Sequence, residues 1–539
     1  SLGKAKQAVF FLSVPEGDSW RSADSASAPS LESGHLWRAG GRACHQYHRR
    51  TGLLPDNAVS GGTGAESRGK SSEGLTICSL PQTRRERQCF ENNFFHVCER
   101  RLATGRILVY NFIGQQKASG GQKKRDSDSR RSRLYDAGGK KDMYSKVTDS
   151  VYYIGTDDKT IDLFESQYVV PNGVSYNSYL IMDEKVAVMD TVDPRAEEAW
   201  FANLEEALGG RKPDYLVISH LEPDHAGSIR LLRQQYPDVQ IVGNNKTFGM
   251  LEGYHGIKEG LFEVKEGDTL NTGRHELVFY MAPMVHWPEV MVTYDVTDKI
   301  VFSADAFGTY GTLDGGVIDT EMNVEHYWEE MIRYYSNIVG KYGSPVQRAL
   351  QKLSGLDIQT ICSTHGPVWR EYASKAIDIY DRMSRYEGEE GVVIIYGSMY
   401  GNTEQMAEAI AASLADNGIK NIVMHNVSHT SHSFIIADVF KYKGLIVGCP
   451  TYNTQMYPEM EALLSKLASR EIKGRYLGYF GSFTWASAAV KKIAEFNDKL
   501  KFEPVGNPVE MKHSMKAETN TQAKELAKAM ADRLKADRK

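Results

Sequence analysis

The stretch that most constrains this chain is VISHLEPDHAGS, residues 217–228. An apolar run from Tyr215 to Ile218 ends abruptly. Within the six positions 220–225 lie two imidazoles and two carboxylates: His220, Glu222, Asp224 and His225. In an extended chain, residues 220, 222 and 224 would point the same way. A polar surface loop is the competing interpretation. So many metal-binding side chains at the end of a buried strand favour a metal site.

Length and composition are those of a soluble protein with several domains. The chain has 539 residues, which corresponds to two to four domains at roughly 100–200 residues each. No apolar run approaches the roughly 18 residues of a membrane-spanning helix. The apolar patch from Ala8 to Leu12 is too short for a secretory signal and has no clear cleavage site. We therefore expect a cytoplasmic protein without a membrane partner.

Residues 1–142 differ in composition from the rest of the chain. They carry 24 Lys and Arg against 14 Asp and Glu and show no sustained hydrophobic period. The charged run 122–142 predicts disorder. The segment lacks the interleaved aromatic residues of a single-strand nucleic-acid binder, so no nucleic-acid partner is expected. We expect ordered structure to begin near Met143. The preceding residues would be an extension of unknown use, or sequence upstream of the true start.

The six cysteines divide between this segment and the remainder. Four lie in residues 1–142, at spacings that fit no standard zinc finger: Cys44, Cys78, Cys89 and Cys98. Cys362 and Cys449 each lie beside an apolar run, and we expect them to be buried thiols. This usage fits a reducing compartment.

Residues 143–389 alternate short strands with helices and turns. Strands are predicted over 151–158, 175–184, 185–193, 214–219, 240–244 and 275–284, with a hairpin over 290–305 and helices over 194–208 and 229–237. This mixture predicts a layered α/β sandwich in preference to a single parallel sheet.

Three more candidate ligands follow apolar runs in this region: His286, Asp305 and His365. With the central motif they make four imidazoles and three carboxylates. A single structural zinc needs four ligands, whereas seven, one of them able to bridge, suit two metals about 3.5–4 Å apart. Imidazole and carboxylate donors without thiolate suit iron, manganese or zinc.

Residues 390–539 begin with an apolar strand, Val392 to Tyr396, then a small-residue turn and a helix from Thr403 to Leu414. This order places backbone N–H groups at a helix N-terminus, where phosphate binds. The loop has neither a GxGxxG pattern nor a Walker lysine, so dinucleotide and ATP sites are disfavoured. Two later strands end in loops that carry aromatic residues, at the edge where doubly wound parallel sheets bind ligands. The candidate binding residues are Ser398, Met399, Tyr400, Gly401, Asn402, Thr403, Pro450, Thr451, Tyr452, Asn453, Thr454, Gly481, Ser482, Phe483, Thr484 and Trp485.

The ligand pattern H-x-E-x-D-H, followed by His, Asp and His at strand ends, resembles the metallo-β-lactamase superfamily. Its hydrolases usually show H-x-H-x-D-H, and Glu222 in place of the second His is the mark of the flavodiiron proteins, or A-type flavoproteins. The added anionic oxygen favours iron over zinc. The resemblance implies that three ligands, His220, Glu222 and His286, hold one iron. It gives Asp224, His225 and His365 to the other iron, and makes Asp305 the bridge.

The loop from Ser398 to Thr403 is similar to the flavodoxin loop that binds the FMN phosphate. Tyr400 departs from it, because flavodoxins usually have Thr there. The resemblance covers a metallo-β-lactamase-like αββα domain, 143–389, and a flavodoxin-like doubly wound parallel sheet, 390–539. A rubredoxin-like pair of CxxC motifs does not follow, and a third electron-entry module is not expected.

The family resemblance implies a function and an assembly. An external donor, rubredoxin or a reduced deazaflavin, would supply electrons through FMN to two non-haem irons that reduce O₂ to water, NO to N₂O, or both. Domains of this size have centres on the order of 40 Å apart, which is too far for fast direct transfer within one chain. A head-to-tail homodimer, paired again into a tetramer in some members, would set the flavin of one chain against the irons of the other.

Two other functions are compatible with parts of the sequence. One is a zinc metallo-hydrolase with an appended flavodoxin electron-carrier domain, which metal analysis would separate from an iron protein. The other is a plain electron carrier with a degenerate first domain, which the intact set of seven ligands disfavours.

The composition of residues 1–142 predicts no share in catalysis. Deleting them should leave iron content, FMN content and turnover unchanged, as measured by elemental analysis, flavin absorbance and gas consumption. Loss of any of the three would show that the segment packs on the catalytic domains or supplies ligands.

Overall fold

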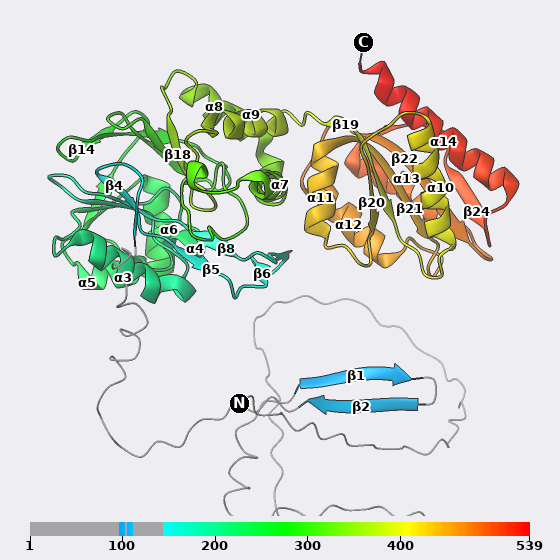
Figure 1. Ribbon diagram of the computed structural model, residues 1–539, viewed down its shortest axis with the longest axis horizontal. Coiled ribbons are helices and arrows are strands. Elements are labelled where there is room, and N and C mark those ends of the chain that lie inside the picture. Colours follow the sequence, from blue (N-terminus) through cyan, green and yellow to red (C-terminus); the bar gives the residue numbers. More distant parts are fainter. Residues whose placement is uncertain (1–95, 103–104, 112–143, 539) are drawn as a thin grey trace, which may run out of the picture. The chain divides into compact units, whose positions relative to one another are not determined.

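The computed structural model describes residues 96–102, 105–111 and 144–538. The first two ranges form an antiparallel pair, β1 (His96–Leu102) and β2 (Gly105–Asn111) (Figure 1). The sequence patterns did not predict this pair. The remainder of residues 1–142 lies outside the described residues. That remainder includes the run 122–142, predicted to be disordered, and three of the four cysteines of this segment: Cys44, Cys78 and Cys89. The boundaries at residues 142 and 389 remain predictions.

The elements within residues 145–384 form what is called here the N-terminal lobe. One of its sheets has seven strands, in the order β13-β12-β11-β10-β9-β4-β3. The strands β10 to β13 are parallel, and β9, β4 and β3 continue the sheet with antiparallel pairs. Their bounds are β3 (Ser145–Lys146), β4 (Val151–Tyr153), β9 (Tyr179–Ile181), β10 (Ala187–Met189), β11 (Tyr215–Val217), β12 (Gln240–Gly243) and β13 (Leu261–Glu263).

The second sheet has five strands, in the order β14-β15-β16-β17-β18. They are antiparallel except for the last pair, β17 and β18. Their bounds are β14 (Thr269–Asn271), β15 (Glu276–Met281), β16 (Met291–Asp295), β17 (Ile300–Phe302) and β18 (Thr360–Cys362). Two small ladders stand apart from both sheets: β5 (Thr156–Asp158) with β8 (Val174–Tyr176), and β6 (Leu163–Phe164) with β7 (Tyr168–Val169).

The two sheets pack face to face over a shared apolar core. Ile181 and Val217 from the first sheet and Phe279 and Phe302 from the second belong to one buried cluster. Helices cover the outer faces (Figure 1). They are α3 (Glu197–Leu208), α4 (Pro223–Ala226), α5 (Ile229–Gln235), α6 (Asn245–His255), α7 (Glu325–Tyr334), α8 (Gly343–Leu353) and α9 (Ala373–Ser384). The predicted αββα sandwich is confirmed.

The C-terminal lobe is built on one parallel sheet in the order β20-β19-β21-β22, with β23 and β24 both pairing β22. Its strands are β19 (Glu389–Tyr396), β20 (Ile422–Asn426), β21 (Tyr442–Pro450), β22 (Tyr476–Phe483), β23 (Glu503–Pro504) and β24 (Val509–Lys512). The strand order reverses between β19 and β21, which is where doubly wound sheets bind ligands.

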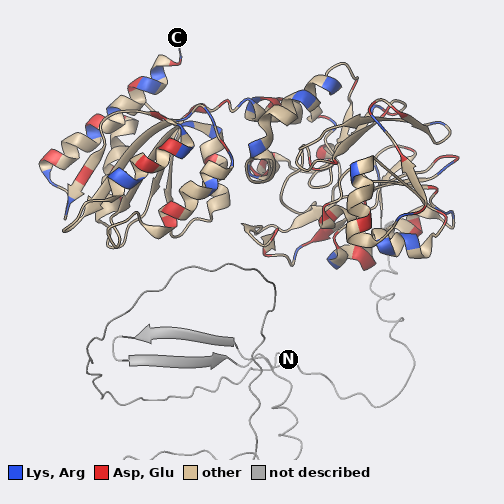
Figure 2. Ribbon diagram, turned by 180° about the vertical axis from the view of Figure 1, so that it is seen from behind, with Lys and Arg blue, Asp and Glu red and all other residues tan. Residues whose placement is uncertain are grey.

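Helices lie on both faces of this sheet, as the doubly wound prediction requires. α10 (Asn402–Asp416) packs on α14 (Ala517–Ala536), and α12 (Pro458–Ser469) packs on α13 (Ala489–Leu500). Charged side chains lie mainly on helices and loops, and the central strands are almost free of them (Figure 2). None of the helices in the described part of the chain has the length and apolarity needed to cross a bilayer.

The two lobes contact one another through α11 (His432–Lys441), which packs against α7 and the following π-helix. The buried Arg333 donates to the carbonyl of Val169 at 2.9 Å and to the hydroxyl of Ser433 at 3.2 Å. Its guanidinium also lies 4.3 Å from the ring centre of Tyr310 and 4.4 Å from that of Phe434. One buried cation therefore links the metal-ligand lobe to the C-terminal lobe.

Candidate functional site

The central motif combines a strand end with a short helix. β11 ends at Val217, and α4 begins at Pro223 with Glu222 at its N-cap. The prediction that residues 220, 222 and 224 alternate along an extended chain is wrong beyond Glu222. Proline is favoured at the first position of a helix, so the backbone turns there. Asp224 and His225 consequently lie on α4 and face a different set of partners from His220.

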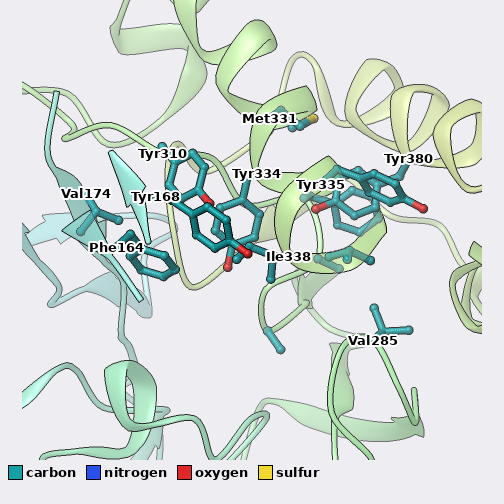
Figure 3. Packing of buried hydrophobic residues seen from close by; sticks show 14 of the residues in the cluster. Phe164, Tyr168, Val174, Val285, Tyr310, Met331, Tyr334, Tyr335, Ile338 and Tyr380 are labelled. Atoms are coloured by element: carbon teal, nitrogen blue, oxygen red, sulfur yellow. The ribbon is translucent and has the colours of Figure 1, made fainter. Parts of the chain in front are cut away.

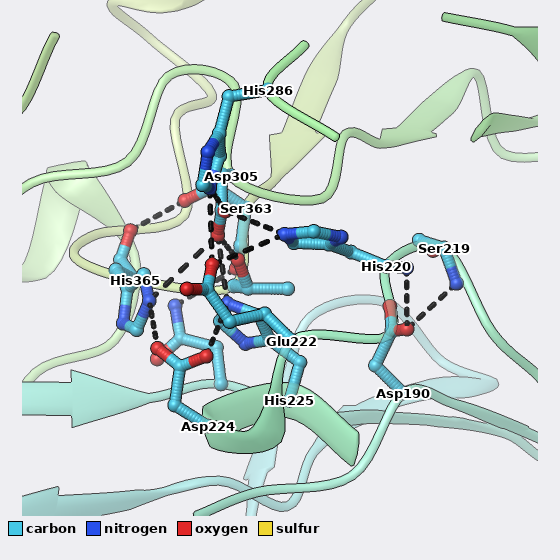
Figure 4. Close-up of polar contacts among 12 residues, drawn as sticks. Asp190, Ser219, His220, Glu222, Asp224, His225, His286, Asp305, Ser363 and His365 are labelled. Carbon is cyan, nitrogen blue, oxygen red and sulfur yellow. Dashed lines mark hydrogen bonds and ion pairs between the residues drawn. The ribbon is translucent and has the colours of Figure 1, made fainter. Parts of the chain in front are cut away.

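All seven predicted ligands converge on one point between the sheets and α4 (Figure 4). His220 follows β11, His286 follows β15, Asp305 follows β17 and His365 follows β18. Those four side chains and His225 are buried, while Glu222 and Asp224 are partly exposed. Strand ends from both sheets therefore supply the cluster from a rigid frame.

The cluster divides into two groups around Asp305. His220, Glu222, His286 and Asp305 form one group, and Asp224, His225 and His365 form the other; within each group the ligand atoms lie within 4.8 Å of one another.

Asp305 turns one oxygen toward each group. Its Oδ2 is 3.4 Å from Nε2 of His220 and 3.1 Å from Nε2 of His286. Its Oδ1 is 2.8 Å from Nε2 of His225 and 3.7 Å from Nε2 of His365. This is the arrangement of a carboxylate that bridges two cations.

The electrostatics of the cluster favour positive charge at its centre. Burial lowers the pKa of His220 and of His286, but their carboxylate partners outweigh it and raise each pKa to about 10. His225 has its pKa raised to about 9, chiefly by Asp224 and Asp305 against the effect of burial. Burial raises the pKa of Glu222, yet hydrogen bonds from His220 and His286 bring it down to about 2. Burial likewise raises the pKa of Asp305, but the buried histidines hold that pKa well below its usual range, so Glu222 and Asp305 stay anionic and stabilise cations.

Several buried atoms in the cluster have no hydrogen-bond partner among the described residues, although Nε2 of His225 lies within ion-pair distance of Asp305. They are both carboxylate oxygens of Asp224 and Nε2 of His225 and His365. Buried polar atoms are nearly always paired, and these atoms converge with the ligand atoms already described. Metal cations would satisfy all of them, so the donor set fits a two-metal centre.

Outer contacts orient the ligands. Nδ1 of His220 donates to Oε1 of Glu289 at 2.7 Å, and Nδ1 of His365 donates to the carbonyl of Ser175 at 2.7 Å. The hydroxyl of Thr364 donates to Oδ1 of Asp305 at 2.7 Å. Sequence reasoning missed these residues. The one available signal was the acid Glu289, three positions after His286.

An aromatic wall lies against His365 on one side of the cluster. Figure 3 shows the rings of this wall, Phe164, Tyr310 and Tyr334, packed among other buried hydrophobic side chains. The ring centres of Phe164 and Tyr334 lie 5.4 and 5.5 Å from that of His365. Tyr310 packs on both Phe164 and Tyr334, at 5.5 and 5.1 Å. All three are buried, so the wall keeps water from this side of the site.

A second site lies at the C-terminal ends of β19, β21 and β22, where three loops enclose a cavity of about 370 Å³. All the predicted binding residues line it except Gly401 and Gly481. Ala486 and His513 also line it and were not predicted, because His513 lies beyond β24 and comes close only through the fold.

The cavity has the features that a flavin phosphate and ring require. α10 starts after Gly401, which has a φ of +86°. The hydroxyl of Ser398 accepts from the amides of Gly401 at 3.1 Å and Glu404 at 3.4 Å, and the other amides at this helix start can face an anion. Thr403 and Ser482 share a hydrogen bond of 2.8 Å between their hydroxyls at the base of the cavity. Trp485 is 86% exposed at its rim and offers a free aromatic face. The residues fit FMN.

Two other features hold no comparable site. His275 is bonded through Nδ1 to Asp295 and through Nε2 to Ser150, each at 2.8 Å, so both ring nitrogens are occupied and the residue is structural. A larger groove of about 740 Å³, between α8 and α9, is lined by both apolar and polar side chains and by none of the seven ligands.

Comparison with known proteins gives matches to both lobes. Residues 174–366 match the family described as ODP family beta lactamase, and residues 394–530 match the flavodoxin family. A protein of Vibrio vulnificus named anaerobic nitric oxide reductase flavorubredoxin is 34% identical over 357 residues, covering 65% of this chain and 72% of the relative. A protein of the same name from Escherichia coli is 32% identical over 354 residues, covering 65% and 74%.

Two solved structures cover both lobes. The rubredoxin oxygen:oxidoreductase of Desulfovibrio gigas has a TM-score of 0.70 and 29% identity, covering 73% of this chain and 99% of that one. The flavodiiron protein of Giardia intestinalis has a TM-score of 0.70 and 28% identity, covering 74% and 98%.

Replacing Asp305 with alanine should remove the carboxylate shared by the two groups. We expect the iron content to fall from about two atoms per chain to about one or fewer, because a two-metal site needs its bridge. The flavin spectrum should be unchanged. Elemental analysis and absorbance measure both, with His255→Ala on the outer helix α6 as the matched control. Full iron content in Asp305→Ala would contradict the bridging role.

Replacing Thr403 with valine keeps the shape of the side chain and removes its hydroxyl. FMN affinity should fall by about tenfold, the scale of one lost hydrogen bond to a charged group. The measurement is quenching of FMN fluorescence on titration into the apoprotein, with Thr521→Val on the exposed side of α14 as the control. Equal affinity in the two variants would argue against this phosphate loop.

Proposed function

The chain belongs to the flavodiiron protein family, and we propose that it passes electrons from an external donor through FMN to a diiron centre that reduces O₂, NO or both. As a member of this family it is an oxidoreductase that carries FMN and two non-haem irons. The observation that carries the proposal is the pair of ligand groups around Asp305, with a flavin cavity in the same chain.

The proposed ligands are His220, Glu222 and His286 for one iron and Asp224, His225 and His365 for the other, with Asp305 between them. When bound, the irons supply coordination positions for a diatomic gas and the flavin supplies one or two electrons at a time. The chain itself holds the two cations close together through Asp305. Its buried carboxylates balance their charge, and the wall formed by Phe164, Tyr310 and Tyr334 excludes water.

A zinc hydrolase on the same fold is not favoured. Glu222 occupies the position where the hydrolases usually have histidine, and its carboxylate accepts from both His220 and His286 at 3.2 and 3.0 Å. A hard anionic oxygen at this position favours iron. The relatives that cover both lobes carry the names of oxidoreductases, which supports the same choice.

The names of the relatives indicate both gases and one class of donor. The Vibrio vulnificus relative is named a nitric oxide reductase and the Desulfovibrio gigas relative a rubredoxin oxygen:oxidoreductase. We propose that this chain takes electrons from rubredoxin or, alternatively, from a reduced deazaflavin, and that both gases act at the same two irons.

The placement of the flavin cavity supports transfer between two chains. Every residue that lines the cavity belongs to the C-terminal lobe, while the lobes contact one another through α11. Large apolar side chains at the rim are exposed, with Tyr400 at 88%. Leu163, beside the ligand-contacting Phe164, is also exposed. A cluster of exposed apolar groups, such as the one at the cavity rim, marks an interaction site.

We propose a head-to-tail homodimer, in which the rim of one cavity packs near the metal centre of the partner. A two-fold axis repeats this contact and closes the assembly. Two such dimers could pair into a tetramer without altering the contact.

The gas reaction is tested by anaerobic stopped-flow oxidation of the fully reduced protein. We expect O₂, NO or both to reoxidise the flavin about 100-fold faster than in the His365→Ala variant, because that variant lacks a two-metal centre. The control is wild-type protein mixed with gas-free buffer. If neither gas oxidises the wild type faster than the variant, the proposed function is wrong.

Transfer between chains is tested by complementation. One parent carries His365→Ala and lacks a complete metal centre, and the other carries Thr403→Val with Trp485→Ala and has a weakened flavin site. After dissociation and reassembly, a mixed dimer has one interface with both sites intact, so activity should partly return, to at most about half of wild type by this symmetry. Each parent taken through the same treatment alone is the control. No recovery in mixtures shown to contain heterodimers would contradict the proposal.

A further inference from the structure

We propose that Glu289 makes the two iron positions electronically unequal. It would favour the ferric state of the iron held by His220, Glu222 and His286, called here the Glu222 position. The first electron to enter the oxidised pair would then go to the iron held by Asp224, His225 and His365, called the Asp224 position. This inference rests on the proposed metal ligands and goes beyond them.

Apart from outer contacts, the two positions have equivalent donor sets. Each has two imidazoles, one carboxylate of its own and one oxygen of Asp305. A difference in reduction potential must therefore come from groups that touch the ligands from behind.

Glu289 is such a group, and it acts on one position. Its side chain is 1% exposed, and Oε1 accepts from Nδ1 of His220 at 2.7 Å and from the amide of Leu221 at 3.0 Å. The amide side chain of Asn244 donates to the Glu289 carbonyl at 2.6 Å and fixes the backbone. The carboxylate is thus held against the ring nitrogen of His220 that faces away from the metal.

The other histidines have weaker outer partners or none described. Nδ1 of His365 donates to a neutral backbone carbonyl, that of Ser175. Nδ1 of His225 is buried and has no partner among the described residues. His286 meets Glu222 and Asp305 through Nε2, the nitrogen that faces the metal position.

Asp190 is the other buried carboxylate behind the centre, and it does not act through an imidazole. Its Oδ1 accepts from the backbone amides of Ser219 at 2.7 Å and His220 at 3.4 Å (Figure 4). Those two amide dipoles offset its charge, and its role is to hold the loop that carries His220.

A carboxylate that accepts the N–H of a metal-bound imidazole makes the other ring nitrogen a stronger donor. Stronger donation stabilises Fe(III) more than Fe(II), because the higher charge gains more from it. The iron of the Glu222 position therefore has the lower reduction potential. With both irons bound, the first electron from the proposed external donor would reduce the iron at the Asp224 position from Fe(III) to Fe(II). The second electron would then reduce the iron at the Glu222 position.

The sign of a mutational effect tests this order. Glu289→Gln preserves a hydrogen-bond acceptor for His220 and removes the negative charge, which raises the potential of the Glu222 position alone. If that position is reduced second, the difference between the reduction potentials of the two one-electron steps, called here the gap, becomes smaller. If it is reduced first, the gap widens.

The experiment is a redox titration of the full-length holoprotein, followed by the EPR signal of the mixed-valent pair, with iron quantified in each sample. We expect Glu289→Gln to keep two irons and to lower the equilibrium constant for forming the mixed-valent state by about tenfold, or about 59 mV for one electron. Asp190→Asn is the matched control and should shift the gap much less. Glu289→Asp keeps the charge and should shift the gap in the same direction, but less than Glu289→Gln.

The outcomes separate this inference from the proposed function. Two irons with an unchanged or widened gap in Glu289→Gln would overturn the role of Glu289 and leave the diiron centre intact. Wild-type protein that binds no iron pair would overturn the proposed function itself. If Glu289→Gln loses iron, Glu289→Asp decides the matter, because a widened or unchanged gap there overturns the inference equally.

Discussion

The arrangement of the metal centre depends on one carboxylate, that of Asp305. It is fully buried at the end of β17, and its two oxygens face two different sets of ligands. A buried anion in this setting is costly without cations or hydrogen bonds beside it. The four imidazoles, the hydroxyl of Thr364 and two metal ions provide that compensation. This shared carboxylate fixes the positions of the ligands that follow strands of the two sheets relative to one another.

The fold provides the two sites in physically different ways. The sandwich places rigid strand ends and one helical turn around a buried point, where the low dielectric constant strengthens electrostatic interactions. The parallel sheet of the C-terminal lobe places loops at its switch point, where a helix N-terminus faces an open cavity. Contact between the lobes through α11 and Arg333 leaves the cavity rim exposed. In the proposed dimer, that rim would face the metal centre of the second chain.

The convergence of the seven candidate ligands could be predicted from sequence because they follow four apolar runs, and strand ends of a layered fold meet at common edges. The division into two groups could not be derived from spacing, since the expected alternation stops where Pro223 starts α4. Glu289 was missed for a related reason. Only the tertiary fold brings its carboxylate to Nδ1 of His220, 69 residues away in the chain. The three flavin loops were predictable from the strand, turn and helix pattern, whereas His513 at the same cavity was not.

The central claim is that these ligands select a pair of irons and so turn a hydrolase-like fold toward electron transfer. The most direct measurement is elemental analysis combined with Mössbauer spectroscopy on wild-type protein produced with both iron and zinc available. We expect about two irons per chain, present as one magnetically coupled pair. Two zinc ions without iron, or irons that behave as isolated single sites, would contradict it.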